Sequence, residues 1–108
     1  MSDAGEYCMI ITTTSDQETA ERIANALLEE RLAACVQITG IKSFYRWKGA
    51  IQREPEQLLL IKTRSDKYAA VEACIRRNHT YETPEIVQVP ITAGLPAYLN
   101  WVYASCEG

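Results

Sequence analysis

Two long strand-like segments joined by a short turn constrain the fold of this 108-residue chain more than any other feature. Residues 33–47 and 51–63 are rich in β-branched and aromatic types, and the Lys-Gly-Ala sequence at 48–50 is typical of a hairpin turn. Both segments are longer than the usual strand of about 5 to 6 residues. The pattern predicts an extended hairpin whose tip, residues 44–54, projects from the body and invites a partner.

Two positions interrupt the regular alternation of this hairpin. The apolar face changes parity between Ile38 and Ile41. Since a one-residue slip turns every later side chain to the other face, we expect a β-bulge or a sharp bend at Thr39-Gly40. Pro55 cannot donate a ladder hydrogen bond, which predicts an edge or a bulge there.

The rest of the chain alternates between strand and helix patterns. Residues 7–13 predict a first strand, and Ser15 with Glu18 resembles a capping box before an amphipathic helix over residues 16–31. Ser65 is expected to cap a second helix that ends near Asn78. Residues 85–92 predict a last strand, and Pro96 opens a terminal helix.

This order of elements, βαββαβ followed by a C-terminal helix, predicts one α+β domain over residues 1–108. Right-handed crossovers make it ferredoxin-like, with a four-stranded antiparallel sheet, two helices on one face and an extended β-hairpin arm. The strands look apolar on both sides. We therefore expect the last helix and neighbouring subunits to cover the second face.

The composition excludes several classes of protein. A net charge of −3 with scattered Lys and Arg argues against nucleic-acid binding, which needs a broad basic face. No stretch approaches the roughly 20 apolar residues of a membrane span, and the polar start does not resemble a signal peptide. Four widely spaced cysteines without a CxxC pair are expected to be free thiols. We expect a cytoplasmic protein without a membrane partner.

The stretch from His79 to Glu85 is the strongest candidate for a functional site. It contains the only histidine of the chain together with Tyr81, and it joins a predicted helix to the last strand, where loops often carry function. An imidazole here either caps the helix or bonds a backbone carbonyl, or it binds a metal ion or a small ligand. The structural role, the metal ligand and the ligand-binding role all remain open at this point.

Lys62 is the second candidate, because it follows the apolar run 58–61 and should be partly desolvated. Such a lysine needs a carboxylate partner, for which Glu85 is the natural choice, or an anionic ligand. The alternative is a surface lysine whose stem covers apolar neighbours. Trp47 and Tyr81 either pack structurally or add an aromatic wall. The five predicted ligand-binding residues, lining a cleft between subunits, are Trp47, Lys62, His79, Tyr81 and Glu85.

Four separated motifs together resemble the CutA divalent-cation tolerance proteins, and the likeness extends from about residue 7 to residue 105. They are the stretch Leu28 to Val36, Tyr45-Arg46-Trp47-Lys48-Gly49, Lys62-Thr63, and His79-x-Tyr81-x-x-Pro84-Glu85. The resemblance implies a homotrimer of ferredoxin-like subunits, topologically similar to PII signalling proteins, whose β-arms pair with neighbours. It also implies an association with tolerance to copper and other divalent cations.

The resemblance also bears on metal ligands. Copper-binding members of the family use a cysteine near the end of the first strand and two adjacent histidines after the second helix, positions that match Thr12, Asn78 and His79 here. Only His79 keeps the ligand type found in those members. The resemblance therefore implies weak copper(II) binding with His79 as the metal ligand. Two alternatives stay open, a PII-like small-molecule sensor with an anionic ligand on Lys62, and an uncharacterised enzyme without a recognisable nucleophile motif.

Overall fold

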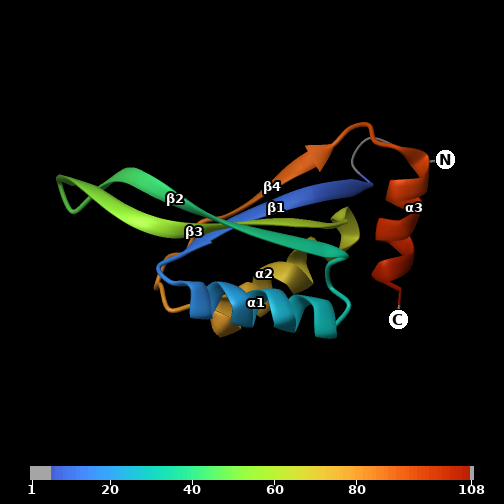
Figure 1. Cartoon of the computed structure of the whole chain (residues 1–108), viewed down its shortest axis with the longest axis horizontal. Coiled ribbons are helices and arrows are strands. Elements are labelled where there is room, and N and C mark those ends of the chain that lie inside the picture. The colour runs from blue at the N-terminus through green and yellow to red at the C-terminus, as the bar shows by residue number, and fades with distance from the viewer. Residues whose placement is uncertain (1–5, 108) are drawn as a thin grey trace.

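The structure is a computed structural model that describes residues 6–107 (Figure 1). Four strands form one antiparallel sheet in the order β2-β3-β1-β4, with α1 and α2 together on one face and α3 at one end. This is the predicted α+β, ferredoxin-like arrangement. In chain order the elements are β1 (Tyr7–Thr14), α1 (Gln17–Glu29), β2 (Cys35–Trp47), β3 (Ala50–Arg64), a 3₁₀ turn (Ser65–Lys67), α2 (Tyr68–Asn78), β4 (Ile86–Ile91) and α3 (Pro96–Ser105).

The main core lies between the sheet and the two helices α1 and α2. Every second residue of the central strand β1 points to this side, and Ile10 pairs there with Ile61 of β3. Burial in this core raises the pKa of the Cys8 and Cys74 thiols. The fully buried residues include Cys8, Ile10, Leu59 and Ile61 from the sheet, Ala20, Ile23 and Leu27 from α1, and Val71, Cys74 and Ile75 from α2.

Both predicted helix caps are wrong. The side chain that caps α1 is Asp16, whose Oδ1 accepts a hydrogen bond of 2.9 Å from the Thr19 backbone N–H, and not Ser15. Hydrogen bonds from Thr19 lower the pKa of Asp16 accordingly. Ser65 donates its backbone N–H to the Glu6 carbonyl at 2.9 Å, which ties it to the residue just before β1. A 3₁₀ turn follows, and within the described chain α2 begins without a side-chain cap.

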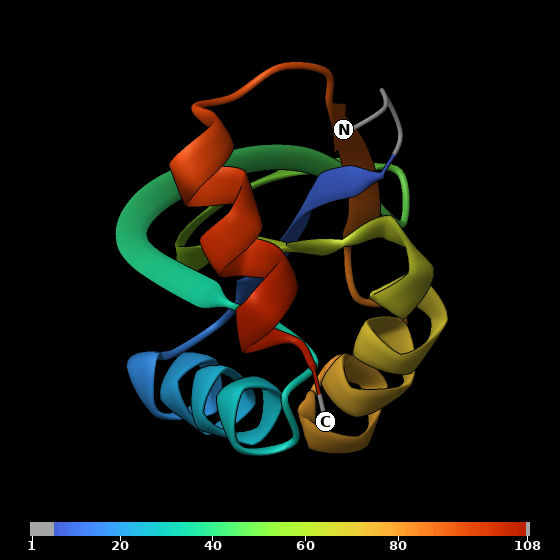
Figure 2. The ribbon, with the colours of Figure 1, turned by 90° about the vertical axis from the view of Figure 1, so that its right-hand side faces the viewer.

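The long hairpin is present, but neither alternative predicted for Thr39-Gly40, a β-bulge or a sharp bend, is found there. Pairing runs in one register from Cys35 with Lys62 to Trp47 with Ala50. The strand bends by coiling instead, and Figure 2 shows β2 sweeping in a wide arc. Lys48 and Gly49 both have positive φ, of 51° and 79°, as a two-residue type I′ turn requires.

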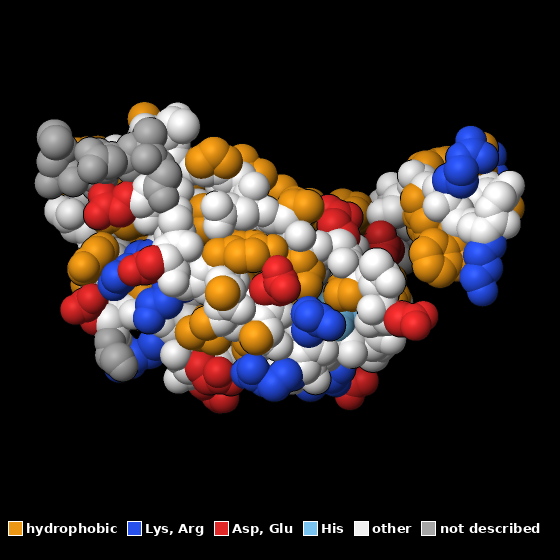
Figure 3. All heavy atoms as spheres, turned by 180° about the vertical axis from the view of Figure 1, so that it is seen from behind, with side chains coloured by type: hydrophobic (Ala, Val, Ile, Leu, Met, Phe, Trp, Pro, Cys, Tyr) orange, Lys and Arg blue, Asp and Glu red, His pale blue; other side chains and the backbone are white. Residues whose placement is uncertain are grey.

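The outer part of the hairpin, residues 41–56, extends past the end of β1 and is called the arm below. The last pair between β1 and β3 joins Thr14 to Gln57, so beyond it β3 has a free edge. Pro55 lies on this edge, as predicted. The arm gives the molecule its longest dimension, with principal extents of 47 × 25 × 21 Å. Figure 3 shows its tip standing apart from the body.

The second face of the sheet is only partly covered. Leu99 and Val102 of α3 pack on Tyr7, Ala34 and Ile91 at one end, so the expectation that α3 covers this face holds only there. The remainder, called the open face below, includes Val87 and Val89, which are 46% and 39% exposed. By register, the open face comprises Met9, Ile11, Leu58, Leu60, Val87 and Val89. Among the described residues, no helix has the length and apolar character to cross a membrane.

Candidate functional site

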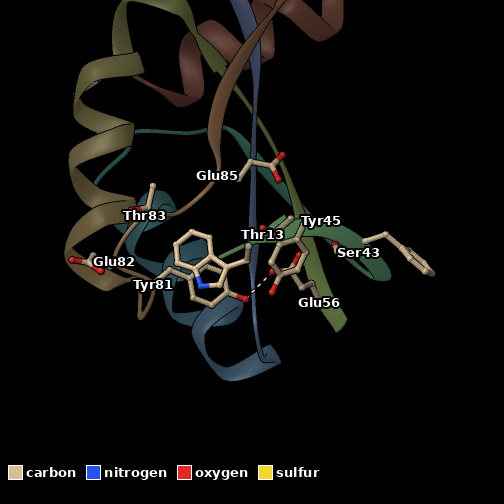
Figure 4. A pocket seen from close by; sticks show the side chains of 10 residues that line it. Thr13, Ser43, Tyr45, Glu56, Tyr81, Glu82, Thr83 and Glu85 are labelled. Atoms are coloured by element: carbon tan, nitrogen blue, oxygen red, sulfur yellow. Dashed lines mark hydrogen bonds between the residues drawn. The ribbon is translucent and has the colours of Figure 1, made fainter. Parts of the chain in front are cut away.

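A cleft of about 510 Å³ lies between the base of the arm and the loop that precedes β4 (Figure 4). One wall comes from the coiled hairpin, the second from the end of β1, and the third from the stretch that contains the predicted motif. We call it the arm cleft. Its lining residues are Thr13, Ser43, Phe44, Tyr45, Trp47, Glu56, Tyr81, Glu82, Thr83 and Glu85. Three of the five predicted ligand-binding residues therefore line one cleft, namely Trp47, Tyr81 and Glu85.

His79 lies behind this wall and holds it in place. The Tyr81 backbone N–H donates to His79 Nδ1 at 3.0 Å, so the ring hydrogen is on Nε2, which donates to the Thr13 carbonyl at 2.7 Å. The imidazole also packs on the Tyr81 ring, with the centroids 4.7 Å apart. His79 thus fastens the loop to the end of β1 and orients Tyr81. Both ring nitrogens are used in doing so.

Two tyrosines of the cleft, Tyr81 and Tyr45, each donate a hydrogen bond to a carboxylate. The Tyr81 hydroxyl donates to Glu56 Oε2 at 2.7 Å, and the Tyr45 hydroxyl donates to Glu54 Oε1 at 2.8 Å. Burial and the Glu56 carboxylate raise the pKa of Tyr81, and the bond to Glu54 raises the pKa of Tyr45. Each phenol therefore stays protonated and donates its hydrogen to the carboxylate beside it. Figure 4 shows the Tyr81 and Tyr45 side chains on opposite sides of the cleft.

The charge of the cleft is entirely negative. Its charged lining residues are Glu56, Glu82 and Glu85, and no described Lys, Arg or His side chain lines it. Figure 4 shows Glu82 turned away from the centre, so Glu56 and Glu85 are the carboxylates that face the space between loop and arm. The remaining surface is largely aromatic. An anion would meet repulsion here, because no positive side chain among residues 6–107 lines the cleft to offset the carboxylates.

Lys62 lies outside this site, and the predicted pairing with Glu85 is wrong. Its Nζ donates to Gln37 Oε1 at 2.5 Å, on the same face as its strand neighbours Met9 and Cys35. Glu85 precedes the pair that joins Ile86 to Thr12, at the other end of β1. Along β1, Met9 and Thr12 are three residues, or about 10 Å, apart, and Glu85 lies one residue further on.

The residues present do not fit a copper site within one chain. Thr12 is fully buried on the helix side of the sheet, and Asn78 Nδ2 donates to the Cys74 carbonyl at 2.9 Å. His79 has no free ring nitrogen. Across residues 6–107 there is no group of three or more His, Cys, Asp or Glu side chains placed to hold a metal ion.

Glu56 lines the cleft but was not predicted as a site residue from the sequence. The hairpin register, counted back from the turn, places Glu56 opposite Ile41 and Glu54 opposite Ser43. This register could have been derived from the sequence, and it predicts two carboxylates at the base of the arm. The contact between Glu56 and Tyr81 joins residues 25 positions apart and depends on the tertiary fold.

Comparisons with known proteins agree with one another. The chain matches the family "CutA1 divalent ion tolerance protein" over residues 8–105. The divalent-cation tolerance protein CutA of Archaeoglobus fulgidus is 45% identical over 98 residues, covering 91% of this chain and 96% of that protein. Chloroplastic CutA of Arabidopsis thaliana is 39% identical over 95 residues, which cover 87% of this chain but only 52% of that protein, so the chain spans about half of the plant relative.

Structural similarity gives the same result. The solved structure of the periplasmic divalent cation tolerance protein CutA from Archaeoglobus fulgidus superposes with a TM-score of 0.92 at 44% identity. The superposition covers 94% of this chain and 99% of that chain. It therefore includes the arm and α3 as well as the sheet and the two helices that cover it.

Proposed function

The chain belongs to the CutA1 divalent ion tolerance family, and on that premise we propose that it acts in divalent-cation tolerance as a homotrimer, with copper(II) as a weakly bound ion. The observation that carries the functional part is the family match over residues 8–105. Among the chain's own features, the arm and the open face support the assembly.

A single chain leaves too much apolar surface and too many free strand edges for a monomer. Val87 and Val89 of the open face are exposed, and the edge strands β2 and β4 each have one free side. Exposed strand edges and contiguous apolar patches are normally covered in soluble proteins. The family resemblance implies a trimer with paired arms. We propose that this assembly covers the open face and the free edges of β2 and β4.

The trimer is tested by sedimentation of the wild-type protein at micromolar concentration. We expect a single species of three times the chain mass of 12.2 kDa, unchanged on tenfold dilution. Neighbouring chains that bury apolar sheet surface should dissociate slowly, because such interfaces resemble a protein core. A species of 12.2 kDa at this concentration would contradict the proposal.

We propose further that His79 has a structural role and that any copper(II) site draws on more than one chain. A histidine that binds copper must offer a free ring nitrogen, and both ring nitrogens of His79 are hydrogen-bonded to the backbone. His79→Phe keeps a ring against Tyr81 but removes both nitrogens. We expect copper(II) affinity, measured by calorimetric titration, to be unchanged, while loss of the two bonds costs about 1–3 kcal/mol of stability.

As a control, the mass and the circular dichroism spectrum of the His79→Phe protein must match those of the wild type. A copper(II) affinity at least about tenfold lower in a folded His79→Phe trimer would make His79 a ligand, as the resemblance implied. The PII-like alternative gains no support here, since Lys62 is bonded to Gln37 and lies outside a cleft with acidic walls.

For the compartment we propose the cytoplasm. All four cysteines, Cys8, Cys35, Cys74 and Cys106, are free thiols, and three of them are buried. Unpaired cysteines are the rule in reducing compartments. The relatives described above as periplasmic and chloroplastic show that the compartment differs among similar proteins.

A further inference from the structure

The arm cleft combines two features that neither the sheet nor the helices require. Three aromatic rings, those of Tyr45, Trp47 and Tyr81, stand around a space of about 510 Å³. Trp47 and Tyr45 remain 51% and 39% exposed, so these rings contribute little to the core. We propose that the arm cleft binds a small organic cation, an alkylammonium compound.

The charge of the cleft identifies the sign of the ligand. Among the described residues, Glu56 makes one hydrogen bond, from Tyr81, and Glu85 makes no hydrogen bond or ion pair. Two carboxylates thus face the cleft without a cation to neutralise them. A positively charged ligand would supply that partner, while an anion would be repelled.

The aromatic walls identify the ligand as organic. The face of an aromatic ring carries negative charge density, and alkylated ammonium groups bind to such faces because they are weakly hydrated. A bare divalent ion needs several converging oxygen, nitrogen or sulfur donors, and the described residues contain no such group. A cleft of this size also exceeds what one ion fills and suits a compound of several carbon atoms.

The tyrosine hydroxyls make the arrangement rigid. Tyr81 is held from two sides, by its hydroxyl on Glu56 and by its backbone on His79. Tyr45 is held by Glu54. The Tyr81 and Tyr45 rings are therefore in place before a ligand arrives, which lowers the entropic cost of binding. All these contacts lie within one chain, so the inference goes beyond the proposed cation-tolerance function and does not depend on the trimer.

The test is a fluorescence titration that uses Trp47 as the reporter. The chain has two tryptophans, and Trp101→Phe on α3 leaves Trp47 as the only one. The probe is choline, and its match is 3,3-dimethylbutan-1-ol, which has the same shape without the charge. We expect saturable quenching by choline and binding of the neutral alcohol weaker by about tenfold or more.

Variants assign the effect to the cleft. Glu56→Gln should weaken choline by about tenfold and leave the neutral alcohol unaffected, whereas Glu29→Gln, an exposed carboxylate on α1, should change neither. Glu85 lies on the exposed rim, so Glu85→Gln should leave the fold intact. It should weaken choline binding by a few-fold and leave binding of the neutral alcohol unchanged. Circular dichroism and sedimentation of each sample separate a failed cleft from a failed trimer.

Three outcomes would overturn the proposal. The first is no saturable response to choline in the folded protein. The second is equal affinity for choline and the neutral alcohol, which would make the cleft merely apolar. The third is tighter binding of arginine amide than of choline, which would assign the cleft to a basic side chain of a peptide or of another copy of the chain.

Discussion

Leu59→Ala is expected to lower the free energy of unfolding by about 2–5 kcal/mol, the largest stability loss we expect from a single truncation. Leu59 is fully buried in β3, on the face covered by α1 and α2. The substitution removes apolar surface from the core and leaves a cavity that the surrounding helices can fill only in part. Urea unfolding followed by circular dichroism at fixed protein concentration measures the loss.

The matched control is Leu28→Ala on α1, which removes the same atoms from a side chain that is 44% exposed. Its cost should stay below about 1 kcal/mol, since little buried surface is lost and alanine favours a helix. Protein concentration must be equal in both experiments, because association stabilises the folded chain by mass action. Equal losses in the two variants would contradict the assignment of the core.

Element order was predictable because local periodicity reports burial directly. The stripe Ala20, Ile23, Leu27 recurs at helical spacing, and all three residues are buried against the sheet. The caps were not predictable to the residue. Ser15 and Asp16 are adjacent and both are good capping types, so only the hydrogen bond from Thr19 decides between them.

The hairpin shows where periodicity stops being informative. A change of parity implies a bulge only while one face of a strand is covered, because cover is what forces apolar residues to that face. Ile38 pairs with Leu59 above the helices, but Ile41 pairs with Glu56, beyond the end of β1. At that point neither face is covered by a helix. The parity change therefore marks the point where the arm leaves the helix-covered part of the sheet, and not a β-bulge.

The candidate site was predictable in part for a similar reason. Tyr81 and Glu85 share one loop, and Trp47 lies beside the turn of the hairpin, so their chemistry was visible locally. Lys62 was grouped with them because it ends an apolar run, but its strand position puts it on the open face beside Gln37. Whether a strand residue faces a cleft depends on register and coiling, which local patterns do not determine.

Ile11→Glu is expected to convert the proposed trimer to monomers. Ile11 lies at the centre of the open face, where the register places it between Leu60 of β3 and Val87 of β4. A carboxylate buried there in an interface, without a partner, costs about 3–5 kcal/mol per chain, which weakens association by about a hundredfold or more. In a sedimentation experiment at micromolar concentration, the variant should have the mass of one 12.2 kDa chain.

Two further variants show whether the open face itself is responsible. Val89→Glu changes the edge strand β4, where the side chain is 39% exposed in one chain, so the fold of the subunit should survive while association weakens. Leu28→Glu places the same charge on α1, on the opposite side of the sheet, and should leave the assembly intact. A wild-type mass for both open-face variants would mean that the arms hold the chains together without this face. Because the arm cleft is built within one chain, choline should still bind to the Ile11→Glu monomer, which separates the assembly of this protein from its proposed ligand site.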